Sequence, residues 1–80
     1  MTNERALLER AQAYDEEALG TIYDQYAPAI YNYLYRRVHD AQVAEDLTGE
    51  VFVRMLQAIQ SEKFWHTSFQ GWLYRIAHNL

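Results

Sequence analysis

The sequence has no cysteine, so it holds neither a disulfide framework nor a thiolate metal site. None of its apolar runs approaches the roughly 18 residues that a membrane-spanning helix needs. The first ten residues, MTNERALLER, lack the apolar stretch of a signal peptide. No internal repeat, low-complexity segment or flexible linker interrupts the chain. We therefore expect a soluble, cytoplasmic protein that does not enter a membrane.

The sequence also lacks the short motifs that mark common enzymes. It has no HExxH pair, GxSxG turn, P-loop or dinucleotide-binding fingerprint. The histidines at positions 39, 66 and 78 are too widely spaced to resemble a metal site. No residues stand at the spacing of a nucleophile and its base. These absences predict a protein without catalytic activity, bound metal or cofactor.

Length and charge narrow the remaining possibilities. Eighty residues suffice for one small domain, which buries only roughly 60% of the surface of its unfolded chain. Half of the residues are hydrophobic, which is enough for a helical core. The net charge of −4, from 11 acidic and 7 basic residues, argues against wrapping of duplex nucleic acid by the whole surface. A local basic patch is compatible with this balance.

Apolar residues recur at the three- and four-residue spacing of amphipathic helices. We expect a first helix over residues 3–13 and a second over residues 16–38, with Asp15 as the N-cap of the second. Pro28 should kink or divide this second helix, because proline has no amide hydrogen for the helical ladder. The stretch YNYLYRRV, residues 31–38, alternates aromatic side chains and could also be read as a strand, but no hairpin partner accompanies it.

A third helix is predicted from Asp40, its expected N-cap, to about residue 60, after a turn at His39. Thr67 and Gln70 fit a capping box, which predicts a fourth helix from that point. No glycine, proline or closing charge cluster marks the end of this helix. Its apolar face consists of Phe69, Trp72, Leu73, Ile76, Ala77 and Leu80. The predicted fold is all-α, a compact bundle of about four helices in a single domain.

The third helix carries an acidic edge beside its apolar stripe. This edge is either a solvated surface next to the core or a docking edge, in which apolar residues supply contact area and carboxylates pair with basic residues of a partner. Helical periodicity alone does not choose between the two. The residues concerned are Glu45, Asp46 and Glu50, which frame Leu47, Val51 and Phe52.

The segment KFWHTS, residues 63–68, is unusually aromatic for a polar loop. Phe64 and Trp65 could fold back onto the small core. They could instead offer stacking surfaces to unpaired bases, with Lys63 and Arg75 meeting phosphates. Polar groups beside the aromatic pair would come from His66, Thr67 and Ser68.

Three stretches, in this order and at these separations, resemble region 2 of bacterial sigma factors and especially the extracytoplasmic-function (ECF) group. They are DEEALGTIYDQYAPAIYNYLYRRVHD, AEDLTGEVFVRML and, after the aromatic loop, FQGWLYRIAHN. The resemblance extends from about residue 5 to residue 80. It implies a fold of packed helices that binds RNA polymerase core and promoter DNA and performs no covalent chemistry of its own.

The resemblance also implies two sets of site residues. AEDLTGEVF is similar to the segment that docks on the clamp-helix coiled coil of the largest polymerase subunit, so the implied polymerase-binding residues are Asp46, Leu47, Glu50, Phe52 and Leu56. The aromatic loop and the start of the last helix are similar to the part that melts the promoter −10 element and holds an extruded base of the non-template strand. The implied DNA-binding residues are Lys63, Phe64, Trp65, His66, Thr67, Ser68, Arg75 and Asn79.

The sequence departs from the family pattern at three points. Gly49 stands where the docking segment usually has glutamine, which should cost the helix about 1 kcal/mol against alanine and remove a polar contact. Trp72 is followed by Leu73 where many sigma factors have two aromatic residues, which again indicates the ECF group. The basic remainder of the promoter-facing helix and the −35-reading domain are absent, so we expect this chain to be a fragment of a longer protein.

We therefore predict a transcription initiation factor domain that docks on RNA polymerase core and captures single-stranded DNA of the −10 element. Arg36 and Arg37 could help it follow the DNA backbone, and an anti-sigma factor is a further expected partner. The alternative is a helical protein–protein interaction module, sigma-like or anti-sigma-binding, without DNA binding of its own. The acidic net charge favours this alternative. Direct binding of single-stranded promoter DNA distinguishes the two.

Overall fold

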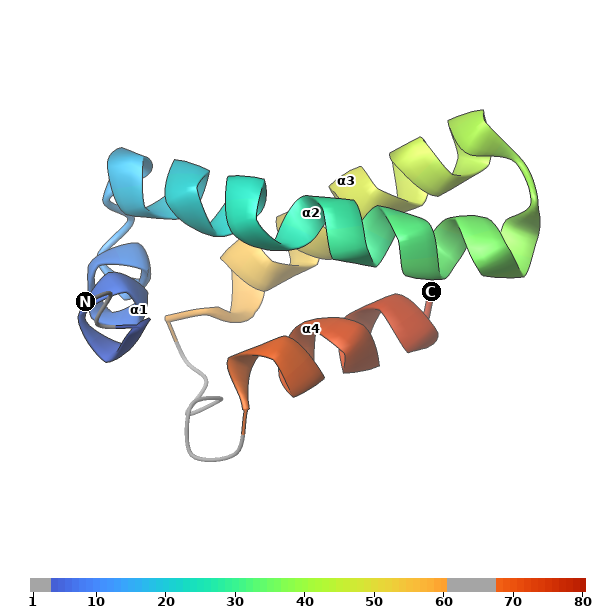
Figure 1. The fold of residues 1–80 in the computed structure, drawn as a ribbon. Helices are drawn as coiled ribbons and strands as arrows, with labels where there is room; N and C mark the ends of the chain where they lie inside the picture. Colours follow the sequence, from blue (N-terminus) through green and yellow to red (C-terminus); the bar gives the residue numbers. More distant parts are fainter. Residues whose placement is uncertain (1–3, 61–67) are drawn as a thin grey trace.

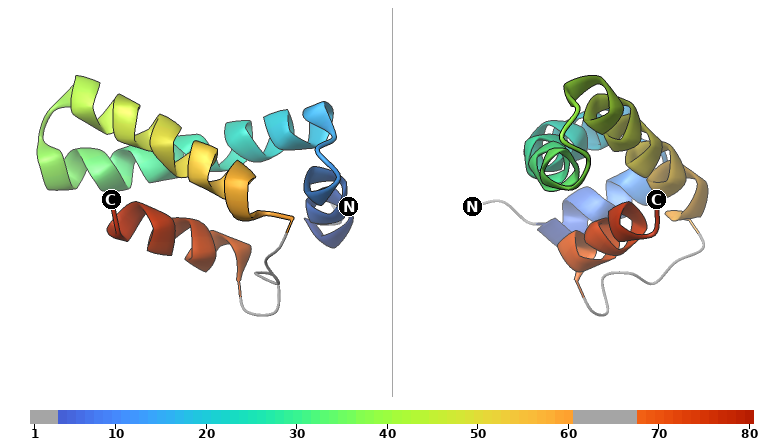
Figure 2. Two further views of the ribbon diagram at one scale, coloured as in Figure 1. Left: turned by 180° about the vertical axis from the view of Figure 1, so that it is seen from behind. Right: turned by 90° about the vertical axis from the view of Figure 1, so that its right-hand side faces the viewer.

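Four helices form in the order that the apolar periodicity predicts. The computed structural model describes residues 4–60 and 68–80. Its helices are α1 (Glu4–Gln12), α2 (Glu16–Val38), α3 (Ala41–Ala58) and α4 (Phe69–His78). The long α2 contacts the other three, and α3 returns alongside it in the opposite direction (Figure 1). Figure 2 shows α4 packed against this pair and α1 at the end where α2 begins. The predicted all-α bundle is confirmed.

Side-chain caps determine where the two longest helices begin. The Asp15 carboxylate accepts a hydrogen bond from the amide of Glu17 at 3.0 Å, and Asp40 accepts one from the amide of Val43 at 3.0 Å. The Arg10 guanidinium donates to Asp15 at 2.7 Å and thereby holds the pKa of that carboxyl below its usual value. Both predicted N-caps are confirmed.

The connection between α2 and α3 is only two residues long, as predicted. His39 ends α2 in the left-handed region at φ 56°, and its amide donates to the carbonyl of Tyr35 at 2.8 Å. Asp40 then caps α3 directly. This short turn fixes α3 antiparallel to α2.

Of the two outcomes predicted for Pro28, a kink or a division of α2, the division does not occur, and the predicted N-cap of α4 is wrong. Pro28 does not divide α2, which continues from Glu16 to Val38. Because Pro28 and Asp24 are both exposed, water can hydrate the Asp24 carbonyl that the proline leaves without an amide donor. The N-cap of α4 is Ser68 and not Thr67: the Ser68 hydroxyl accepts from the amide of Gly71 at 3.1 Å. The backbone of Ser68 is extended, as an N-cap requires, and Thr67 lies outside the described residues.

The core lies between α2, α3 and α4, and Leu8 and Ala11 of α1 extend it at one end. Its largest fully buried side chains are Ile22, Ile30, Val51, Ile59 and Leu73. Thr48 is also buried, but its hydroxyl donates to the carbonyl of Ala44 at 2.7 Å and is therefore satisfied. The core is thus built by all four helices, and it fixes which side chains of α3 and α4 face outward.

A hydrogen bond between tyrosine and glutamate ties α1 to α2. The Tyr26 hydroxyl donates to the Glu4 carboxylate, and the Tyr26 ring meets the buried Phe69 edge to face at 5.3 Å. Partial burial, together with the bond to Glu4 and its negative charge, raises the pKa of Tyr26 to about 12. The phenol is therefore kept in its neutral form when the domain is folded.

This contact predicts a loss of stability at alkaline pH. The folded-state pKa of Tyr26 lies above the unfolded value of about 10, so its contribution is complete below pH 10 and disappears as the pH rises towards about 12. Urea unfolding at pH 9 and pH 11 should show a smaller pH dependence in Tyr26→Phe than in the wild type. Tyr35→Phe, at an exposed tyrosine, should keep the wild-type dependence. An unchanged pH dependence in Tyr26→Phe would contradict the assignment.

Candidate functional site

The outer face of α3 combines exposed apolar and acidic side chains. Val43, Val53 and Leu56 are large apolar residues that are 42%, 46% and 37% exposed. Asp46 and Glu50 are exposed between them. We call these five residues the outer face of α3. An apolar surface with carboxylates among its members fits a partner that offers both apolar and basic side chains.

Hydrogen bonds orient the two carboxylates of the outer face along the helix. Asp46 accepts from the side-chain amide of Gln42 at 3.0 Å, and Glu50 accepts from Arg54 at 3.2 Å. Both bonds join residues four positions apart and are exposed to solvent, so they contribute little to stability. Their carboxylates remain accessible to a partner.

The structure brings together three of the five residues predicted on α3. Asp46, Glu50 and Leu56 share the outer face, whereas Leu47 is half-buried in contact with the core. Phe52 is buried at 6% exposure, with the Tyr23 ring edge to face at 4.9 Å. It lies two residues after Glu50, about 200° around the helix, and therefore faces α2. Its side chain supports Tyr23 and does not join the outer face.

Sequence reasoning missed Val43 and Val53. Both share the helical face of Asp46 and Glu50, because positions 43, 46, 50 and 53 follow the three- and four-residue spacing. The same spacing is present in the sequence, beside the apolar stripe that packs into the core. In a helix with apolar residues on two faces, one face packs into the core of the domain and the other can bind a partner.

A hollow of about 380 Å³ opens between α2 and α3. Its lining includes the acidic side chains of Asp24 and Glu45 and the aromatic rings of Tyr23 and Tyr31. The other lining residues are Ala27, Pro28, Asn32 and Thr48. The acidic character of the outer face therefore continues towards α2.

The predicted residues on α4 lie on an accessible side of that helix. Arg75 and Asn79 are exposed, and Asn79 borders a hollow of about 420 Å³ between α3 and α4. Trp72 and Ile76 line this hollow, as do Arg54, Gln57 and Ala58 of α3. Trp72, a member of the predicted apolar face of α4, is half-buried against the core. Ser68, another of the predicted DNA-binding residues, is exposed and forms the N-cap of α4.

The other predicted DNA-binding residues lie outside the described part of the chain. They are Lys63, Phe64, Trp65, His66 and Thr67. Within residues 4–60 and 68–80, no group of three or more histidine or acidic side chains could hold a metal ion. No helix in the same ranges is long and apolar enough to cross a membrane. The candidate binding features in these ranges are the outer face of α3, the exposed side of α4 and the hollows beside them.

Comparison with known proteins identifies the family. The family model described as Sigma-70 region 2 matches residues 22–80, which include α3, α4 and most of α2. The chain belongs to the sigma-70 region 2 family. The predicted resemblance is thereby confirmed, and the outer face of α3 and the exposed side of α4 are surfaces of a sigma region 2 domain.

Curated relatives place this domain among ECF sigma factors. The ECF RNA polymerase sigma factor BldN of Streptomyces coelicolor is 46% identical over 74 residues, which cover 92% of this chain and 28% of BldN. From Bacillus subtilis, YlaC is 40% identical over 79% of this chain and 36% of its own length, and SigW is 39% identical over 82% and 35%. The chain thus spans about a third of the length of these relatives.

A solved structure supports the same assignment. A chain of the RsbN–BldN complex matches this domain with a TM-score of 0.85 and 45% sequence identity, over 91% of this chain and 53% of that one. The four-helix arrangement is therefore the fold of an ECF sigma factor region 2.

Proposed function

We propose that this domain acts in transcription initiation, by docking on RNA polymerase core and capturing single-stranded DNA of the promoter −10 element. Family membership supplies the general role. The observation that carries the docking surface is the outer face of α3, where Val43, Val53 and Leu56 stand exposed with Asp46 and Glu50. Polymerase contributes the chemistry of RNA synthesis, and the domain contributes binding.

The polymerase-binding surface is proposed to be this outer face, with the clamp helices of the largest subunit as its partner. Burial of the three apolar side chains supplies contact area, and the two carboxylates select a basic partner. Leu47 lies at the margin of the contact. Phe52 acts from the core by holding Tyr23 at the surface.

Gly49 allows a test of this surface that does not damage the fold. A Cβ at Gly49 or at Gly20 would meet nothing within 4 Å, so Gly49→Gln and Gly20→Gln should each stabilise their helix by about 0.5–1 kcal/mol. Only Gly49→Gln should also raise affinity for polymerase core, because Gly49 lies among the docking residues. Thermal unfolding and core-binding titrations measure the two effects. An equal gain in affinity from Gly20→Gln would contradict the assignment.

The DNA-binding surface is proposed to include the exposed side of α4, with Arg75 and Asn79, and the preceding residues Lys63, Phe64, Trp65, His66, Thr67 and Ser68. Stacking of a base on an aromatic side chain is worth about 1–3 kcal/mol. Unstacking of the captured base costs a few kcal/mol, which these contacts offset.

Trp65→Ala tests this second surface. Binding of a single-stranded −10 oligonucleotide by the polymerase-bound domain should weaken by about 5- to 150-fold, the equivalent of one lost base–aromatic stack. Affinity for polymerase core should not change. Circular dichroism provides the control, because a loss of helicity in the variant would assign Trp65 to the core and remove it from the DNA-binding surface.

Regulation by a protein that covers these surfaces is a further part of the proposal. The similar chain in the RsbN–BldN complex was solved bound to another protein, which favours an anti-sigma factor as a partner of this domain. The same observation and the net charge of −4 favour the second candidate function, a protein-binding module without DNA binding. Binding of single-stranded promoter DNA by the polymerase-bound domain would exclude that candidate.

A further inference from the structure

The hollow between α2 and α3 has two aromatic walls that are held in place by neighbouring rings. Its volume of about 380 Å³ falls within the range of small-molecule sites. The Tyr23 ring meets the buried Phe52 edge to face at 4.9 Å, and the Tyr31 ring stacks with that of Tyr35 at a centre-to-centre distance of 6.0 Å. Because these contacts restrict both rings, a ligand meets walls that are already positioned.

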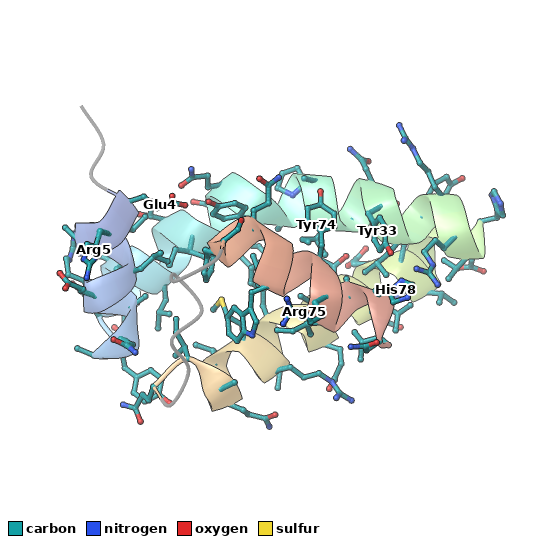
Figure 3. The ribbon with its side chains drawn as sticks, turned by 90° about the horizontal axis from the view of Figure 1, so that it is seen from below. Glu4, Arg5, Tyr33, Tyr74, Arg75 and His78 are labelled. Atoms are coloured by element: carbon teal, nitrogen blue, oxygen red, sulfur yellow. The ribbon has the colours of Figure 1, made fainter. Side chains whose placement is uncertain are left out.

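Two carboxylates at this hollow are unpaired within residues 4–60 and 68–80. Asp24 and Glu45 are exposed members of its lining, and no basic residue of the described ranges joins them there. No salt bridge or hydrogen bond engages either carboxylate in these ranges. Figure 3 shows Arg5 on α1 and Arg75 on α4, so neither arginine belongs to the helices that form the hollow. The hollow therefore carries negative charge without a counter-charge.

The same stretch of α2 supplies further acceptors. Asp24 lies in the interior of α2, away from the N-terminal turn where the helix dipole favours a carboxylate. Pro28, four residues later, has no amide to donate to the Asp24 carbonyl, which is left as an acceptor. Asn32 also lines the hollow, and its side-chain oxygen can accept a hydrogen bond. The lining thus combines negative charge, several acceptors and aromatic faces.

A guanidinium group matches this combination. It is planar, it always carries its positive charge, and it presents several N–H donors in a fixed arrangement. Its flat face stacks on aromatic rings, and its edge bonds carboxylates in a bidentate manner. An ammonium group has the charge without the flat face, and the charges of Asp24 and Glu45 would repel an anion.

We propose that the hollow between α2 and α3 binds a small organic cation, whose guanidinium group stacks against the rings of Tyr23 and Tyr31 and pairs with Asp24 and Glu45. This site is additional to the proposed function and does not depend on it. A free small molecule is the expected ligand, because the rings and both carboxylates line one hollow of small-molecule size and can be engaged together.

The first arm of the test compares two probes of the same shape. N-butylguanidinium and its uncharged counterpart N-butylurea are titrated at low salt into the isotope-labelled 80-residue chain, while the tyrosine ring signals are followed by NMR. Saturable shifts of the Tyr23 and Tyr31 signals are expected with N-butylguanidinium and none with N-butylurea. Absence of these shifts, or equal shifts with N-butylurea, overturns the proposal.

Two further probes test the class and the source of the ligand. N-butylammonium carries the same charge without the planar group and should bind more weakly, whereas equal affinity overturns the assignment to a guanidinium. Acetyl-glycyl-arginyl-glycinamide presents the same group on a peptide backbone and should bind no more tightly than N-butylguanidinium. A peptide complex that is more than about tenfold tighter assigns the hollow to an arginine of a partner protein and overturns the small-molecule source.

Substitutions locate the site. Asp24→Asn/Glu45→Gln should weaken N-butylguanidinium binding by about 2- to 25-fold, the equivalent of two exposed ion pairs. Tyr31→Leu removes one aromatic wall and should weaken it by about 2- to 5-fold. Glu9→Gln/Glu16→Gln makes the same change in charge at exposed positions outside the lining and should keep the affinity. Wild-type affinity in Asp24→Asn/Glu45→Gln, or an equal loss in the matched variant, overturns the site. This comparison remains decisive if Tyr31→Leu unfolds, because all four of its positions are exposed.

Discussion

The double variant Asp46→Lys/Glu50→Lys is expected to lose binding to RNA polymerase core by more than about 100-fold. Truncation of one member of a desolvated charge pair costs 2–5 kcal/mol or more, and reversal of two charges adds repulsion. The variant should remain folded, because the bonds from Gln42 to Asp46 and from Arg54 to Glu50 are exposed and weak. Affinity for core, measured by competition with an intact sigma factor, is the readout.

A matched variant separates local from general electrostatics. Glu9→Lys/Glu16→Lys makes the same change in net charge at exposed positions on α1 and at the start of α2. It should retain most of the affinity for core. If both double variants lose binding equally, net charge and not the outer face of α3 governs the association. Retained binding by Asp46→Lys/Glu50→Lys would remove the proposed docking surface.

Leu73→Ala is expected to bring the domain close to unfolding. Leu73 is fully buried where α4 packs on α2 and α3, and deletion of a buried leucine side chain typically costs 2–5 kcal/mol. A domain of this length has a total stability of about 4–12 kcal/mol. Each kcal/mol lowers the melting temperature of so small a domain by about 4–8 °C, so the variant should melt at least about 8 °C below the wild type.

Leu56→Ala is the control for this prediction. It deletes the same atoms from a side chain that is 37% exposed on the outer face of α3, so its cost should stay below about 1 kcal/mol. Calorimetric melting of both variants provides the comparison. Similar melting temperatures for the two would show that α4 is not an integral part of the core, and would contradict the fold described here.

Features set by a few neighbouring residues could be predicted from the sequence. The helices, the caps Asp15 and Asp40, and the turn at His39 depend on local periodicity and on side chains that bond to nearby amides. The exchange of Ser68 for Thr67 as the cap of α4 shows the limit of this reasoning. Both residues supply a hydroxyl that can cap a helix, so the residue types alone do not choose between them.

Features that depend on packing could not be predicted in the same way. Phe52 and Leu56 both continue the apolar pattern, but only Phe52 is buried, because α2 covers one side of α3 and leaves the other open. The contact between Arg37 and His78 joins two helices that are far apart in the sequence, and no local pattern announces it. Family resemblance supplied the candidate residues, and packing determined which of them reach the surface.

The most direct test of the central claim is a photo-crosslinking experiment on the outer face of α3. Val53, the most exposed apolar residue of this face, is replaced by a benzophenone amino acid, and the domain is irradiated with RNA polymerase core. The same replacement at Gln25, exposed on α2, serves as the control. We predict a crosslink from position 53 to the clamp helices of the largest subunit and none from position 25. A folded, polymerase-bound domain that crosslinks from position 25 and not from position 53 would contradict it.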